Sequence, residues 1–139
     1  MAQSIREVMT DQVITLPADA SIVDAGRAMR ENDIGDVVVM DGDRFHGLLT
    51  DRDIVVRAIA EGRDPSSTQV RDVTTEDVRT LSPDSTVAEA VDIMRGAAVR
   101  RIPVLDGDRP VGIVSIGDLA MRQDEGSALA DISEAPPTD

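Results

Sequence analysis

The sequence predicts a mixed α+β fold made of two tandem copies of one unit, each with the order strand, helix, strand, strand, helix (β-α-β-β-α). Three observations support this prediction. A shift of 65 residues aligns residues 8–54 with 73–119 without a gap. Each copy has one stripe of apolar residues at helical spacing between short apolar runs. The same turn sequence, Asp-Gly-Asp, separates two of these runs in both copies, at 41–43 and 106–108.

Each copy begins with a short extended segment, at residues 13–16 and 78–81. A helix follows, because Ser21 and Thr86 each precede an acidic residue at the spacing of a capping box. Apolar residues then recur on one helical face in both copies. They are Ile22, Ala25 and Met29 in the first copy and Val87, Ala90, Val91 and Met94 in the second.

Two apolar runs follow each helix and form a hairpin about the Asp-Gly turn. The runs are residues 37–40 and 46–49 in the first copy, and 102–105 and 111–114 in the second. Because a helix connects the first strand to the second, we expect those two strands to be parallel. A last helix begins near Asp51 or Ile116, and the first of these ends at Gly62, a helix-terminating glycine.

The repeat defines the domain organisation. Residues 1–62 form the first repeat with an N-terminal lead-in, in which residues 4–9 are expected to be a short helix. Residues 63–72 form a linker, 73–125 the second repeat, and 126–139 a tail expected to be disordered. Packing of the two copies face to face about a pseudo-twofold axis would cover the second face of each sheet and leave two equivalent clefts.

Composition restricts the classes of function. The 139 residues contain no cysteine, tryptophan or tyrosine, one phenylalanine and one histidine, and the formal net charge is −13. No disulfide, thiolate metal site or histidine metal site is therefore expected. The negative charge and missing aromatic residues argue against nucleic acid or an anionic membrane as partner. The absence of cysteine suits a reducing cytoplasm, and no signal peptide or membrane-spanning segment is visible.

The order of motifs resembles a known family. Each copy has Val-x-Thr, a helix, an apolar strand, Asp-Gly-Asp and then Gly-h-h-[Ser/Thr]-x-x-Asp, where h is apolar. This order resembles a CBS domain, and two copies in register resemble the CBS pair called a Bateman module. The resemblance covers residues 5–122, and the stretch 47–54 is similar to small stand-alone bacterial CBS-pair proteins.

The resemblance implies a binding function, with AMP, ADP, ATP or S-adenosylmethionine as ligand and no required cofactor. It implies that Asp53 and Asp118 accept hydrogen bonds from ribose hydroxyls, and that Thr50 and Ser115 reach phosphate or ribose oxygens. The remaining expected contacts come from the strand entries and from the segments before the hairpins. The full set of expected ligand-binding residues is Thr15, Ile34, Gly35, Asp36, Thr50, Arg52, Asp53, Thr80, Val99, Arg100, Arg101, Ser115 and Asp118.

Elementary chemistry fits these roles, although each has a structural alternative. A carboxylate can accept bonds from a cis-diol, and guanidinium groups such as those of Arg100 and Arg101 suit phosphate. Gly47 and Gly112 would let backbone approach closely. Alternatively, Asp53 and its counterpart sit in a first helical turn favoured by the helix dipole, the preceding hydroxyls are helix caps, and the arginines form surface ion pairs.

Two functions remain open at this point. The first is an adenosine-nucleotide sensor that acts as a homodimer on a separate regulated protein. The second is a protein-interaction or stress-associated module with no nucleotide bound. An enzyme is not expected, because no nucleophile–base pair, metal cluster or phosphate-binding glycine loop is visible. The choice of ligand, the occupied cleft, the regulated partner and the parallel or antiparallel dimer geometry are likewise open.

Overall fold

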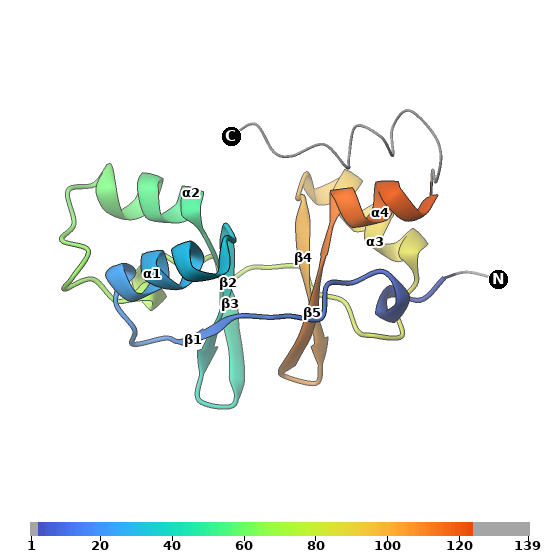
Figure 1. Cartoon of the computed structure of the whole chain (residues 1–139), viewed down its shortest axis with the longest axis horizontal. Coiled ribbons are helices and arrows are strands. Elements are labelled where there is room, and N and C mark those ends of the chain that lie inside the picture. The colour runs from blue at the N-terminus through green and yellow to red at the C-terminus, as the bar shows by residue number, and fades with distance from the viewer. Residues whose placement is uncertain (1–2, 124–139) are drawn as a thin grey trace. The chain divides into compact units, whose positions relative to one another are not determined.

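A computed structural model describes residues 3–123 (Figure 1). They divide into two compact units. The first unit contains the chain up to Gln12, Arg79–Gly107 and the chain from Val111 onward. The second unit contains Val13–Val78 and Asp108–Pro110. Both units combine strands with helices, which confirms the predicted mixed α+β class.

The second unit is built on a three-stranded sheet. Its strands are β1 (Thr15–Pro17), β2 (Asp36–Asp41) and β3 (Arg44–Thr50), in the order β1-β2-β3. Strand β1 is parallel to β2, and β2 is antiparallel to β3. Both predicted pairings are therefore confirmed.

Helices lie on one side of this sheet (Figure 1). Helix α1 (Ile22–Asn32) starts in the predicted capping box, in which Ser21 and Asp24 exchange side-chain bonds with each other's backbone. The predicted last helix is a short α2 (Asp51–Asp53) that continues as the π-helix η2 (Ile54–Ile59). Gly62 follows it with φ +75°, as expected for a helix-terminating glycine. The core contains the stripe of α1 and the inner face of the sheet, with Val37, Val39 and Leu49 buried.

The first unit repeats this plan with one strand reduced. It contains η1 (Ile5–Glu7), α3 (Val87–Ala97), the hairpin β4 (Arg101–Asp106) and β5 (Arg109–Ser115), and α4 (Ile116–Gln123). The predicted strand at 78–81 is present only as one parallel bridge, between Leu81 and Val104. In the other unit the Val38 N–H donates to the Ile14 carbonyl. The corresponding residue here is Pro103, which has no N–H, so this bond cannot form.

The lead-in segments are exchanged between the repeats. The Ile5 N–H donates to Ser85 O at 2.8 Å, and Ile5 is fully buried in the core of the first unit. The matching residue of the linker, Val70 in η3 (Val70–Asp72), donates to Ala20 O at 2.8 Å and is buried in the second unit. Each unit therefore contains the lead-in of the other repeat, and the bounds expected for the repeats at residues 62 and 73 stay a prediction.

Two further expectations concern the whole chain. Within residues 3–123, no helix has the length and apolar character needed to cross a lipid bilayer. The tail expected at 126–139 lies outside the described residues. Packing of the repeats about a pseudo-twofold axis stays a prediction.

Candidate ligand-binding site

The first candidate site lies where β3 passes into α2. Asp36, the first residue of β2, pairs with Thr50, the last residue of β3. The Asp51 N–H donates to the Gly35 carbonyl at 2.9 Å. A Cβ at Gly35 would lie 3.0 Å from Asp51 Oδ2, so the chain passes close to this helix start. The structure thus brings Gly35, Asp36, Thr50 and the α2 turn together.

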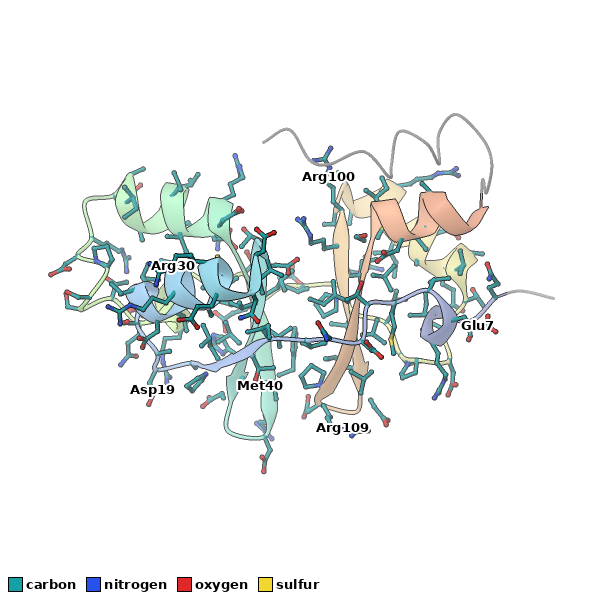
Figure 2. All side chains as sticks on the ribbon, viewed as in Figure 1. Glu7, Asp19, Arg30, Met40, Arg100 and Arg109 are labelled. Atoms are coloured by element: carbon teal, nitrogen blue, oxygen red, sulfur yellow. The ribbon has the colours of Figure 1, made fainter. Side chains whose placement is uncertain are left out.

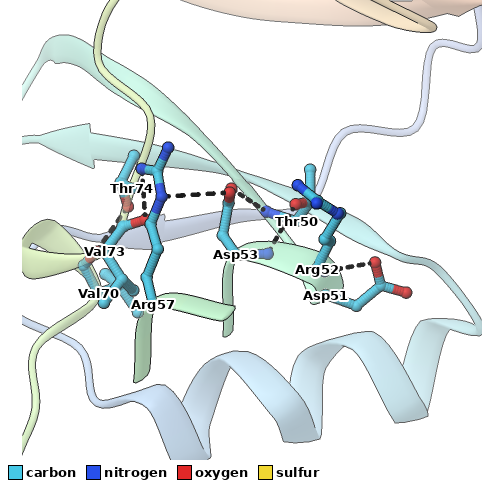
Figure 3. Close-up of polar contacts among 8 residues, drawn as sticks. All are labelled: Thr50, Asp51, Arg52, Asp53, Arg57, Val70, Val73 and Thr74. Carbon is cyan, nitrogen blue, oxygen red and sulfur yellow. Dashed lines mark hydrogen bonds and ion pairs between the residues drawn. The ribbon is translucent and has the colours of Figure 1, made fainter. Parts of the chain in front are cut away.

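Thr50 and Asp53 form a capping box at the start of α2 (Figure 3). The Asp53 N–H donates to Thr50 Oγ1 at 3.1 Å, and the Thr50 N–H donates to Asp53 Oδ2 at 3.0 Å. The structural alternative for these two residues is therefore correct. It fixes the Asp53 carboxylate at the helix start, where its side chain is 14% exposed. The ligand contact expected for Asp53 stays a prediction.

Arg57 is a part of this site that the sequence reasoning missed. Its Nε lies 3.8 Å from Asp53 Oδ1, and its Nη1 donates to the Val73 carbonyl at 3.2 Å (Figure 3). The side chain is 48% exposed. The spacing of four residues from Asp53 on a helix was the available signal. Arg57 places a cation beside the carboxylate, where it could meet an anionic group of a ligand.

Strand register places the polar residues of this unit on one sheet face. In-register neighbours on adjacent strands, and residues two apart on one strand, share a face. Thr15 pairs with Val38, and Asp36 pairs with Thr50, so all four lie on the face opposite the buried Val37. Thr15 is exposed, but it lies about 7 Å further along the sheet than Asp36. Thr15 and Thr50 therefore share a face but lie at different register positions along the sheet.

Ile34 packs on the core, and Arg52 lies on the surface. Ile34 is half-buried against the core, and its N–H donates to the Met29 carbonyl at 3.0 Å. Arg52 is exposed, and its backbone N–H donates to Asp51 Oδ1 at 2.8 Å. Ile34 therefore serves packing in this structure, and Arg52 is a surface cation at the start of α2.

The second candidate site has the same backbone arrangement. The Asp118 N–H donates to Ser115 Oγ at 3.1 Å, and the Ser115 N–H donates to Asp118 Oδ2 at 3.0 Å. The Ile116 N–H donates to the Arg100 carbonyl at 2.9 Å, as Asp51 does to Gly35 in the first site. The two sites therefore share the same helix cap and the same backbone hydrogen bond, in agreement with the sequence repeat.

Basic residues distinguish the second site from the first. Arg100 and Arg101 are exposed and follow the half-buried Val99 at the entry to β4. Figure 2 shows the Arg100 side chain projecting outward from its unit. The first site has Gly35 and Asp36 at these two positions. At these two positions the second site therefore has two cations, where the first has a glycine and an acidic residue.

Thr80 lies in a groove of its own. The groove has a volume of about 580 Å³ and runs between the segment 80–85, helix α3 and the end of β4. Its polar lining includes Thr80, Ser82, Ser85 and Glu89. No other residue predicted to bind ligand lines it, so within residues 3–123 the groove is separate from the Ser115–Asp118 cap.

The two glycines at equivalent positions of the repeat, Gly47 and Gly112, each lie close to the backbone of another segment. A Cβ at Gly47 would clash with the Thr75 carbonyl oxygen, and a Cβ at Gly112 would lie 2.9 Å from the Thr10 carbonyl oxygen. The predicted close backbone approach is therefore confirmed at both positions. Its cause is the pairing of Leu48 with Thr75 and of Ile113 with Thr10, rather than a ligand.

The described residues hold no group of three or more metal-ligating side chains. The single histidine, His46, is mostly buried in β3, with its Nε2 3.8 Å from Glu76 Oε1. One imidazole and one carboxylate are too few for a protein metal centre. His46 thus belongs to the packing of β3 against the segment that follows η3.

Two repeats of one β-α-β-β-α plan with matching caps, the second with its first strand reduced to one bridge, define a CBS-domain pair. The CBS domain model matches residues 5–59 and again residues 70–125, and the chain belongs to this family. The chain is 36% identical over 134 residues to the CBS domain-containing protein YhcV of Bacillus subtilis, covering 94% of this chain and 95% of YhcV.

A second relative is hypoxic response protein 1 of Mycobacterium tuberculosis, 34% identical over 116 residues, with 83% of this chain and 81% of that protein covered. The crystal structure of a hypoxic response protein with two coordinated zinc ions superimposes with a TM-score of 0.78 at 32% identity. It covers 86% of this chain and 98% of the other. These likenesses confirm the predicted family and the tandem CBS fold.

Proposed function

We propose that the chain is a regulatory module that binds an adenosine-type nucleotide, AMP, ADP, ATP or S-adenosylmethionine, at its two capped helix starts. The observation that carries the proposal is the repeated cap. Asp53 and Asp118 are each held with one carboxylate oxygen on a backbone N–H. Such a fixed carboxylate can accept ribose hydroxyls without further loss of side-chain entropy.

Positive charge beside each cap supports a ligand that carries phosphate or another anionic group. Arg57 stands next to Asp53, and Arg100 and Arg101 enter β4 beside the second cap. These cations matter because the chain carries a net charge of −13, which opposes any anion at long range. Local guanidinium groups can hold phosphate against that field.

The proposed mechanism is a population shift without chemical change in the ligand. A nucleotide that binds one conformation more tightly favours that conformation in proportion to the difference in affinity. A separate protein would read the conformation. The proposal includes a cytoplasmic, non-enzymatic role for a homodimer.

One observation favours the alternative of an interaction module that binds no nucleotide. Asp53 Oδ1 already faces the Arg57 guanidinium, so a ribose would have to share or displace that contact. The relative named a hypoxic response protein fits a stress-associated role equally well.

The test is equilibrium gel filtration in buffer that contains AMP, ADP, ATP or S-adenosylmethionine. Without tryptophan or tyrosine the protein absorbs little at 260 nm, so absorbance reports the nucleotide. We expect a ligand peak at the protein volume and a matching trough at the ligand volume. Absence of a peak with all four ligands at near-millimolar concentration would contradict the proposal and favour the interaction module.

Substitution of the caps must separate ligand binding from helix stability. Asp53→Ala with Asp118→Ala removes both candidate carboxylates and is expected to abolish the peak. Asp24→Ala with Glu89→Ala is the matched control, because it removes the same type of cap from α1 and α3. Each lost cap costs about 1 kcal/mol in either variant. Equal loss of binding in both variants would show that the effect is only structural.

A further inference from the structure

The groove beside Thr80 is lined by residues outside both capped helix starts. Its volume of about 580 Å³ falls in the range typical of small-molecule sites, and all of its lining residues belong to the first unit. The apolar part of the lining is Leu81, Ile93 and Leu105. Leu81 is buried in the core of this unit and Ile93 packs against that core, so the fold holds this wall in place.

Hydrogen-bond acceptors make up most of the remaining lining. The Ser82 N–H donates to Ser85 Oγ at 3.0 Å, and the two serine hydroxyl oxygens are 3.2 Å apart. Glu89 caps α3, with its Oε2 accepting from the Thr86 N–H at 3.4 Å. Asp92 lies three residues further along α3 on the same face, where Cβ atoms are about 5–6 Å apart. The groove therefore combines two carboxylates and several hydroxyl oxygens with an apolar wall.

Charge identifies the class of ligand that this groove accepts. None of the nine residues that line it is basic and two are acidic, so a phosphate-bearing ligand is disfavoured. In the described part of the chain no three metal-ligating side chains come together, so the groove does not fit a metal ion either. An ammonium group has three N–H donors and no acceptor, and a methylene chain packs well on apolar side chains. The net charge of −13 attracts such a cation at long range.

Comparison with the first repeat shows that the fold does not impose this lining. The shift of 65 residues aligns Ser85 with Ala20 and Asp92 with Arg27. The first repeat thus has a methyl group in place of this hydroxyl and a guanidinium group in place of the second carboxylate. Two carboxylates on one helix face beside the groove are therefore specific to the second repeat.

We propose that this groove binds an aliphatic diamine or polyamine, with two ammonium groups on Glu89 and Asp92 and the methylene chain along the apolar wall. The site shares neither cap with the proposed nucleotide contacts. It can therefore hold whether or not the proposed function is correct.

The first test is calorimetric titration of the full chain with butane-1,4-diamine at physiological ionic strength, which screens diffuse attraction to the net charge. We expect saturable binding of one diamine per chain. Butan-1-amine should bind at least about tenfold more weakly, because it lacks the second charge-assisted contact. In NMR spectra, the diamine should shift the backbone amide signals of residues 80–85 and 89–93, and leave those of residues 15–20 and 24–28 in the other repeat unchanged.

A charge variant tests the position of the site. Asp92→Arg introduces the residue type that the first repeat has at this position, and it should weaken diamine binding at least about tenfold. Glu31→Arg is the matched control, because it makes the same change of charge at an exposed position of α1 in the other unit and should leave the affinity unchanged. Circular dichroism checks that both variants are folded.

Three results would overturn the proposal. Absence of diamine binding would do so, and binding of an arginine-rich peptide under the same conditions would then assign the groove to a basic protein partner. Equal weakening by Asp92→Arg and Glu31→Arg would show diffuse attraction to the net charge only. Amide shifts confined to segments outside the groove would place the amine elsewhere.

Discussion

Replacement of Gly47 by alanine should destabilise the protein, although alanine is normally the better residue in a strand. The added Cβ would overlap the Thr75 carbonyl oxygen and crowd Thr74 Cγ2, which it would approach to 2.7 Å. Thr75 must then move away from β3. That movement weakens two backbone bonds, from the Leu48 N–H to Thr75 O at 3.1 Å and from the Thr75 N–H to Leu48 O at 3.2 Å.

The magnitude follows from these contacts. Two weakened hydrogen bonds cost about 1–3 kcal/mol together. The lower backbone entropy of alanine in the unfolded chain returns about 0.5–1 kcal/mol. The central values of these two ranges, about 2 and about 0.75 kcal/mol, leave a net loss in free energy of unfolding of about 1 kcal/mol, which urea unfolding followed by circular dichroism measures. The melting temperature should fall by about 3–8 °C.

A matched control comes from the same unit. Gly26 lies within α1, and a Cβ there would meet nothing within 4 Å. Gly26→Ala should therefore raise the free energy of unfolding by about 0.5–1 kcal/mol, because alanine favours a helix. If Gly47→Ala were as stable as the unmodified chain, the close approach of Thr75 to β3 would not be a constraint and the reasoning would be wrong.

Three further substitutions test other contacts. Ile5→Ala should cost about 2–4 kcal/mol of unfolding free energy, because Ile5 is fully buried against the second repeat; a loss below 1 kcal/mol in urea unfolding would refute the exchanged lead-in. Arg57→Gln should cost about 1 kcal/mol, since the Val73 carbonyl loses its donor, and an unchanged melting curve would count against that bond. The side-chain hydroxyl and then the backbone N–H of Ser66 lower the pKa of Asp64. These bonds stabilise the fold above the ordinary pKa of an aspartate, and their contribution is lost as the pH falls through the pKa of Asp64 in the folded chain. Ser66→Ala removes the hydroxyl and should therefore raise the pKa of Asp64 in a carboxyl NMR titration. An unchanged pKa would exclude the side-chain bond.

Local chemistry explains which parts of the fold could be predicted. The caps at Ser21 and Thr86 depend on residues three apart, and the apolar stripes of α1 and α3 depend on one helical period. Both signals depend only on residues close together in sequence, so they can be recognised without knowledge of the fold. The reduced strand at 78–81 is explained by one residue, Pro103, which lacks the N–H needed for pairing. This effect can be predicted only when the strand that pairs with 78–81 has been identified.

The tertiary contacts of the chain could not be predicted from local sequence in this way. The lead-in segments around Ile5 and Val70 are similar short apolar sequences, so nothing local says which repeat each one covers. The π-helix depends on how the segment after Asp53 packs, and its sequence reads as an ordinary helix. In the candidate site, the motif predicted Thr50 and Asp53 together, whereas Arg57 was recognisable only by its position on the same helix face.

The exchanged lead-ins set an order for folding during synthesis. The second unit lies almost wholly within Val13–Val78, so its three-stranded sheet and core can form once the first part of the chain has left the ribosome. Ile5, in contrast, must wait for Val114 and Leu119, which are made more than a hundred residues later. Ile5 is therefore buried late although it is made before both repeats, and contacts of such long sequence separation slow this closing step. Until α4 is complete, Ile5 of the nascent chain therefore lacks part of the core that buries it.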